Sequence, residues 1–131
     1  MLAPRLSSVP AARHWVAAAY ARLTARGCCS PGVRTGLLEL LTTEVVANAV
    51  LHGAGEVAVE LSCEADALRV AVSDTGAGVP VVRRAGPSVV GGQGMALVDT
   101  LAARWGVRAG TGAEPDRGTG KTVWFELPAR T

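Results

Sequence analysis

The sequence predicts a single α/β domain, because stretches with the apolar repeat of helices are interleaved with short runs that alternate as strands do. The clearest helix covers residues 37–53, in which no Pro or Gly interrupts the repeat before the last position. Residues 56–62 and 68–73 alternate Val and Leu with other residues, which is typical of a β-hairpin. No internal repeat or second core is visible, so residues 1–131 are expected to form one domain.

The composition restricts the partners and the location of the chain. Apolar residues make up 49% of the sequence but aromatic residues only 4%, so the core is expected to consist of Ala, Val and Leu. A net charge of +2, with no run of Lys or Arg, argues against nucleic acid and membrane surfaces as partners. No segment approaches the roughly 18 uninterrupted apolar residues of a membrane span, and the N-terminus lacks a signal-peptide pattern. We therefore expect a cytoplasmic protein, in which the adjacent Cys28 and Cys29 are reduced, small apolar residues.

The remaining elements follow from turn residues and short periodic runs. Residues 1–9 provide an abbreviated edge strand at most, because two prolines interrupt the N-terminal region. An Ala-rich helix over residues 11–26 starts after Pro10 and ends at Gly27. The further expected segments are a turn at 28–32, loops at 79–90 and 110–120, a helix at 95–102, and strands at 104–109 and 121–127.

Two polar residues of the long helix are expected in its apolar stripe. Glu44 and Asn48 are four residues apart and lie one turn above the other. At about 100° per residue they share the stripe with apolar residues, and the threonines lie on the opposite, wettable side. The apolar stripe consists of Leu37, Leu40, Leu41, Ala47 and Leu51, and the opposite side of Thr35, Glu39, Thr42 and Thr43. Burial of Glu44 and Asn48 requires either an internal hydrogen-bond network or a polar cavity in which a cation or an anionic ligand is the partner.

Glycines mark two further candidate positions. Asp74 ends the second strand of the hairpin and begins the sequence DTGAG, in which Gly76 and Gly78 allow a ligand close to the backbone. An ordinary turn would give the same letters. Gly92 and Gly94 open the helix at 95–102, and backbone amides at such a helix start favour phosphate, although a flexible hinge would use glycines too.

The common nucleotide and metal motifs are absent from the sequence. It contains no GxxxxGK[ST], and its GxG at 92–94 follows a loop, which does not fit a dinucleotide-binding fingerprint. His14 and His52 have no Cys or His at metal-ligand spacing, and no Ser lies in a nucleophile elbow. We expect His14 to face solvent.

The order of the motifs resembles that of the Bergerat-fold ATPases, which include histidine kinases and gyrase-type ATPases. The matching pieces are E-x3-N-A-x2-H-G from Glu44, D-x-G-x-G from Asp74, a loop, G-x-G opening a helix, and a strand with Thr122. The segments GGQGMALVDTLAARWGV and GTGKTVWFEL are similar to those of the small stand-alone bacterial members, which are serine/threonine kinases acting as anti-sigma factors. The resemblance implies an α/β two-layer sandwich, with a mixed β-sheet, helices on one face, and ATP–Mg²⁺ between the helices and a mobile lid.

The resemblance also implies roles for individual residues. Glu44 would be the general base, and Asn48 would coordinate Mg²⁺. Asp74 would accept the adenine amino group, with Thr122 close by. The other residues expected around ATP are Gly76 and Gly78 at the base and ribose, and Gly92, Gly94 and Met95 at the phosphates. Lys121 is expected to be a solvated strand residue, and solvent exposure is also expected for Arg83 and Arg84 in the lid, of which at most one could meet the γ-phosphate.

Two functions follow from this resemblance. The first is a serine/threonine kinase that uses ATP and Mg²⁺ to phosphorylate an anti-sigma-factor antagonist. The alternative is a catalytically weak ATP-dependent switch that sequesters a sigma factor or another partner. Retention of Glu44 beside Asn48 favours the kinase, because a nucleotide sensor does not need the base. The resemblance also allows a homodimer through the first strand, and it implies no direct contact with nucleic acid or membrane.

Overall fold

The computed structural model describes residues 1–3, 6–52, 57–64, 66–74, 92–109 and 121–129. Within these residues, three helices and four strands follow one another in the predicted order, with ends within a few residues of the predicted ones. They are α1 (Val9–Ala25), α2 (Thr35–His52), β1 (Ala58–Cys63), β2 (Ala67–Asp74), α3 (Gly92–Leu101), β3 (Arg104–Ala109) and β4 (Lys121–Pro128).

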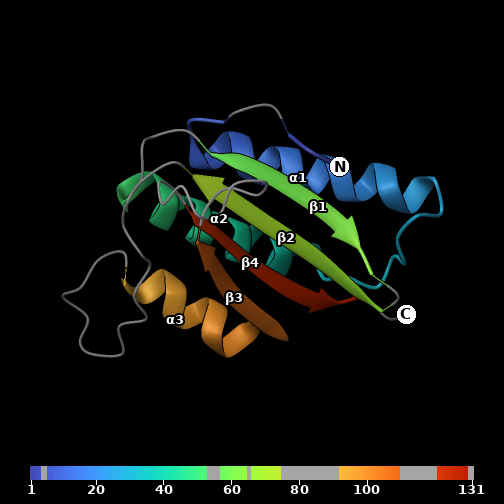
Figure 1. The fold of residues 1–131 in the computed structure, drawn as a ribbon. Coiled ribbons are helices and arrows are strands. Elements are labelled where there is room, and N and C mark those ends of the chain that lie inside the picture. The colour runs from blue at the N-terminus through green and yellow to red at the C-terminus, as the bar shows by residue number, and fades with distance from the viewer. Residues whose placement is uncertain (4–5, 53–56, 65, 75–91, 110–120, 130–131) are drawn as a thin grey trace.

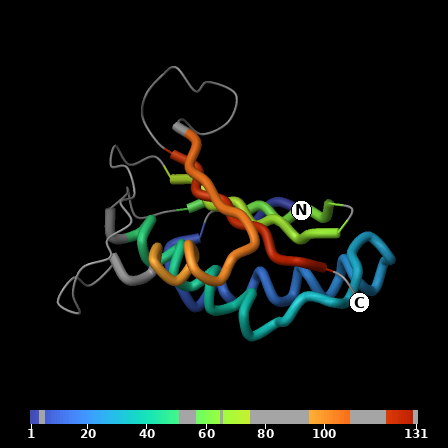
Figure 2. Tube along the Cα trace, turned by 90° about the horizontal axis from the view of Figure 1, so that it is seen from below, coloured from blue at the N-terminus to red at the C-terminus, as the bar shows by residue number. Residues whose placement is uncertain are grey.

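The strands form one sheet in the order β1-β2-β4-β3, and each of these three pairings is antiparallel (Figure 1). All three helices cover the same face of this sheet, which is seen edge-on in Figure 2. The arrangement confirms the predicted two-layer α/β sandwich. The core between the layers is formed mainly by Val, Leu and Ala, with Phe125 as its largest fully buried side chain.

The alternation of side chains along β2 and β4 determines what each face of the sheet carries. In β2, every second residue from Leu68 to Asp74 is buried against the helices, and the residues between them are half-buried on the other face. In β4, Lys121 is the first residue of the buried series that continues through Val123 to Leu127. The last residue of β2 and the first of β4 therefore lie opposite each other on the helix-covered face.

The other face of the sheet carries a cluster of polar and aromatic side chains. The guanidinium of Arg69 lies 4.1 Å from the ring centre of Trp124 and its Nε is 3.2 Å from a Glu126 carboxylate oxygen. Gly106 on β3 pairs with Trp124, and a Cβ atom at this glycine would be 2.8 Å from the indole ring. The close approach of the indole ring to the β3 backbone thus depends on glycine.

Helix α1 begins two residues before the predicted start and ends next to the predicted end. The hydroxyl of Ser8 accepts a hydrogen bond from the amide of Ala11 at 3.2 Å, and Pro10 lies in the first turn. The helix ends before Gly27, which has a φ of 76° that residues with a side chain rarely adopt.

A tyrosine connects α1 to the turn that leads into α2. The hydroxyl of Tyr20 donates to the carbonyl oxygen of Ser30 at 2.6 Å and accepts the amide hydrogen of Val33 at 3.0 Å. The amide of Val33 is buried, so this hydroxyl supplies a hydrogen bond that water cannot.

The buried face of α2 differs from the predicted stripe. Leu40 is 39% exposed and Ala47 is exposed, whereas Thr42, which was predicted on the wettable side, is fully buried. Helix α2 lies between α1 and α3 and also contacts β2, so most of its circumference is covered. Its apolar residues are spread around the whole helix, and a periodicity argument cannot define one buried face in that case. The buried apolar side chains of its described part are Leu38, Leu41, Val45, Val46 and Ala49.

The N-terminal segment lies along the outer edge of β1. Leu2 bridges Glu60 and Leu6 bridges Val57, both antiparallel, and the amide of Ala3 donates to the carbonyl of Val59 at 2.8 Å. This is the abbreviated edge strand that the sequence predicts. The segment satisfies the outward backbone groups of β1, which would otherwise form an open sheet edge.

A disulfide joins Cys29, in the turn between α1 and α2, to Cys63 at the end of β1, with a Cα–Cα distance of 5.6 Å. The expectation that Cys29 is a reduced thiol is therefore wrong, whereas Cys28 is free and exposed. The two bonded cysteines are separated by 34 positions, and only the packing of the helices on the sheet brings them together. No described helix is long and apolar enough to cross a membrane.

Candidate functional site

Several predicted site residues lie at the same end of the sandwich. Figures 1 and 2 both show the C-terminal end of α2, the end of β2, the start of β4 and the start of α3 on one side of the molecule. These element ends carry Asn48, Asp74, Lys121 and the glycines that open α3. The opposite end of the sandwich contains the disulfide.

Helix α2 supplies an amide and a carboxylate to this region. Asn48 is only 4% exposed although its side chain is polar, and Glu44, one turn earlier, is half-buried. Side chains four residues apart on a helix have Cβ atoms about 5–6 Å from each other. The predicted pairing of Glu44 with Asn48 on one side of the helix thus fits the structure, with Glu44 the more accessible of the two.

The buried carboxylate of Asp74 faces a lysine. Asp74 is 1% exposed, and its Oδ2 atom is 3.0 Å from Nζ of Lys121, the residue directly opposite it in the sheet. The side chain of Lys121 is only 3% exposed. The prediction that Lys121 is solvated is therefore wrong, because the first residue of β4 is on the face that the helices cover.

Thr122 occupies the other face of the sheet. Its hydroxyl oxygen lies 2.8 Å from that of Ser73, the residue that pairs with it across the β2–β4 ladder. Consecutive residues of a strand point to opposite faces, so Thr122 and Asp74 are separated by the thickness of the sheet. The residue of β4 that faces the Asp74 carboxylate is thus Lys121, and the role of Thr122 near the adenine stays a prediction.

Helix α3 begins at Gly92, so Gly92 and Gly94 lie in its first turn as predicted. A first helical turn has amide hydrogens without partners inside the helix, and these favour anions such as phosphate. The side chain of Met95 is fully buried and fixes this turn to the core. Met95 therefore contributes to the site through the position of the backbone.

Some predicted residues cannot be placed. Gly76 and Gly78, together with Arg83 and Arg84 in the expected lid at 79–91, lie outside the described residues.

The chemistry of the described residues fits a nucleotide with Mg²⁺ better than a metal held by protein alone. No group of three or more His, Cys, Asp or Glu side chains in the described part could hold a metal ion. Mg²⁺ commonly takes one or two protein oxygens and completes its shell with substrate phosphates and water. The amide oxygen of Asn48 could serve as such a ligand, and the start of α3 could receive the phosphates.

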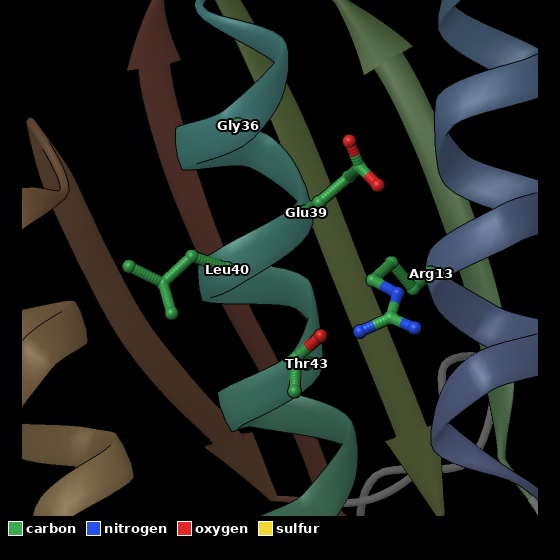
Figure 3. Close-up of a pocket in the computed structure, with 5 residues that line it drawn as sticks. All are labelled: Arg13, Gly36, Glu39, Leu40 and Thr43. Atoms are coloured by element: carbon green, nitrogen blue, oxygen red, sulfur yellow. The ribbon is translucent and has the colours of Figure 1, made fainter.

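A hollow of about 430 Å³ lies elsewhere, on the outer side of the helix layer between α1 and α2. Figure 3 shows Arg13 of α1 and Glu39 of α2 on its two sides, with Leu40 and Thr43 further along α2. None of the predicted site residues lines this hollow, so it is separate from the candidate site.

One site residue was missed by sequence reasoning, although a signal was present. Lys121 is the only lysine in the sequence, whereas the other 12 basic residues are arginines. A lysine that occurs once in the sequence, directly before the predicted site residue Thr122, could have been recognised as a candidate site residue.

Two of the solved structures that resemble this chain are those of histidine kinases. One is a mycobacterial sensor histidine kinase, MprB, with 20% identity and a TM-score of 0.55 over 74% of this chain and 73% of that one. Another is the nucleotide-free catalytic domain of the histidine kinase ThkA, with 14% identity and a TM-score of 0.55 over 74% of this chain and 68% of that one. At these identities the likeness shows the fold.

The sequence gives the family itself. No curated protein matches the chain at a significant level. The model of one family, described as histidine kinase-, DNA gyrase B- and HSP90-like ATPase, matches residues 34–131, which is well over half of the chain. The chain therefore belongs to the family of histidine kinase-, DNA gyrase B- and HSP90-like ATPases, and it is an ATP-binding domain.

Proposed function

We propose that this ATP-binding domain is a serine/threonine protein kinase of the anti-sigma-factor type, which phosphorylates an anti-sigma-factor antagonist. The observation that carries the proposal is the pair on α2, in which a half-buried Glu44 lies one turn before a buried Asn48. A domain that only binds ATP needs Asn48 as the metal ligand, but it does not need an accessible carboxylate such as Glu44 beside that ligand.

The buried residues hold the nucleotide in this proposal. Asp74 would accept a hydrogen bond from the adenine amino group, and the amide oxygen of Asn48 would be the protein ligand of Mg²⁺. Bound ATP–Mg²⁺ supplies the γ-phosphoryl group and neutralises the charge that develops on it. The amides at the start of α3 orient the phosphates.

Glu44 acts on the second substrate. Its half-buried position leaves the carboxylate accessible to a Ser or Thr hydroxyl of a docked protein, whose proton it accepts as the oxygen attacks phosphorus. The proton moves to the Glu44 carboxylate, and the bond between the γ-phosphorus and the bridging oxygen of ADP breaks.

The choice of an anti-sigma-factor antagonist rests on two segments. Residues 91–107 and 118–127 are similar in sequence to those of the small anti-sigma-factor kinases. In the structure these segments include α3, β3 and β4, and the indole nitrogen of Trp105 donates to the carboxylate of Asp99 at 2.9 Å, which ties β3 to α3. The substrate would thus be a protein that this domain phosphorylates on Ser or Thr, and a sigma factor would be a second partner.

The test compares Glu44→Gln with the wild type in two assays. Glutamine keeps the shape of glutamate but does not accept the proton, so single-turnover transfer from labelled ATP should fall by roughly 10²–10⁴-fold. The phosphate acceptor is the co-purifying protein in which mass spectrometry finds a phosphorylated Ser or Thr. ATP affinity, measured by calorimetry, should stay near that of the wild type, because Asn48 and Asp74 are unchanged.

Glu39→Gln is the matched control, since Glu39 is also a half-buried glutamate of α2 but lines the hollow between α1 and α2. Its transfer rate should equal that of the wild type. Transfer by Glu44→Gln at the wild-type rate would refute the catalytic role. Tight ATP-dependent capture of the partner with no transfer by the wild type would instead identify the chain as a binding switch.

A further inference from the structure

Lys121 is a buried cation in a chain that otherwise uses arginine. The remaining 12 basic residues are arginines, and Arg104 and Arg108 at the neighbouring strand are exposed. Lysine carries a compact charge on a flexible stem, whereas arginine presents a planar fork that binds both oxygens of a carboxylate. The use of lysine at this position therefore indicates that Asp74 needs a neighbouring positive charge that does not bind both oxygens of its carboxylate.

The contact between Lys121 and Asp74 has the properties of an ion pair. Nζ and Oδ2 are 3.0 Å apart, and both side chains are almost completely buried. Lys121 thus places a positive charge at one oxygen of the Asp74 carboxylate. A carboxylate has about four acceptor positions on its two oxygens, so this contact is compatible with a further donor.

The surroundings make the charge of Lys121 necessary. Val72 and Val123 precede and follow the pair on the same face of the sheet, and they are 1% and 2% exposed. Burial of a carboxylate among apolar side chains is costly unless an opposite charge lies close. In the described part of the chain, the ammonium of Lys121 is the positive charge that lies next to the Asp74 carboxylate.

The other charged residues on the elements packed against β2 cannot supply the positive charge that Lys121 supplies. Those whose side chains are described are all acidic: Glu39 and Glu44 on α2, Glu60 on β1 and Glu126 on β4; the side chain of His52, at the end of α2, is outside the described part. Glu60 and Glu126 are on the face of the sheet away from Asp74, as the strand alternation shows.

We propose that Lys121 is a positioning residue for base recognition: its buried ammonium holds the carboxylate of Asp74 in place by an ion pair, and so produces the preference for a purine that carries an exocyclic amino group. The proposal rests on the proposed role of Asp74 at the adenine base. A carboxylate that is held in position can accept a hydrogen bond from the amino group, and hydrogen bonds to a charged acceptor are stronger than those between neutral groups. Lys121 thus determines specificity without contacting the base itself.

The test measures the affinities of ATP and of purine riboside triphosphate, which has the same ring without the amino group. The wild type should prefer ATP, and in Lys121→Met this preference should fall by about tenfold, because a carboxylate that has lost its ion-pair partner is no longer held in position for the hydrogen bond from the amino group. Methionine keeps the length and apolar stem of lysine. Arg108→Met is the matched control, because Arg108 is an exposed cation opposite Thr122, and its preference should equal that of the wild type.

A double variant separates this role from a structural one. If Lys121 acts through Asp74, Lys121→Met should cause no further loss of the ATP preference in an Asp74→Asn background. A structural role would weaken both nucleotides equally and leave the preference unchanged, which would overturn the proposal.

A second measurement uses the wild-type chain and does not depend on a variant that folds. Because Lys121 is the only lysine, an amine-acylating reagent followed by peptide mass spectrometry reports on this residue alone, with the N-terminal amine as the internal reference. ATP should slow acylation of Lys121 and not of the N-terminus, and equal rates with and without bound ATP would contradict the proposal. Failure of the wild type to bind ATP would refute the adenine site as a whole, whereas ATP binding with an unchanged preference in Lys121→Met would refute the role of Lys121 alone.

Discussion

Removal of the disulfide between Cys29 and Cys63 should lower the free energy of unfolding by about 4 kcal/mol at 25 °C. The disulfide closes a loop with a sequence separation of 34. In the chain-entropy description, opening such a loop restores conformational freedom to the unfolded chain, and the magnitude depends on the logarithm of loop length. For a domain of 131 residues, this corresponds to a decrease of roughly 14 °C in Tm.

The assay is urea unfolding of the oxidised protein and of the protein in excess dithiothreitol, followed by tryptophan fluorescence. Cys29→Ala/Cys63→Ala should unfold at a low midpoint with or without the reductant. Cys28→Ala should behave as the wild type does, because Cys28 is exposed and outside the bond. Thiol titration of the denatured chain should give one free thiol before reduction and three after it. Equal midpoints for the oxidised and the fully reduced protein would refute the reasoning.

Three other substitutions test contacts in the fold and the site. Tyr20→Phe should lower the unfolding free energy by about 1–3 kcal/mol in urea titrations, because the buried amide of Val33 loses its acceptor. Gly106→Ala should cost about 1–3 kcal/mol and shift the tryptophan emission, since the new Cβ would lie 2.8 Å from the Trp124 ring; an unchanged spectrum and midpoint would show that the ring moves freely. Asn48→Ala should abolish the difference between ATP affinities measured with Mg²⁺ and with EDTA, and a retained difference would assign the metal to other ligands.

Local patterns in the sequence were sufficient for the elements and for part of the site. The hairpin, the glycines at the start of α3 and the polar residues Glu44 and Asn48 each depend on neighbours within a few positions. The structure therefore agrees with the order and approximate ends of the helices and strands. Burial of Asn48 also followed from the sequence, because a polar residue in an apolar helix has few alternatives.

Contacts between distant segments could not be predicted in the same way. The buried face of α2 depends on α1 and α3, and its apolar residues surround the helix too evenly to indicate one face. The position of Lys121 opposite Asp74 depends on the register of two strands that are far apart in the sequence. A shift of one residue in that register would have placed Thr122 on the helix-covered face instead.

The position of the disulfide has a mechanical consequence. Cys63 pairs with Leu68 at one end of the β1–β2 hairpin, whereas Asp74 is at the other end. The disulfide thus joins the helix layer to the sheet at the end away from the candidate site. Local opening of the sandwich is therefore expected at the end that carries Asp74 rather than at the end that the disulfide closes. Such partial opening costs less free energy than complete unfolding.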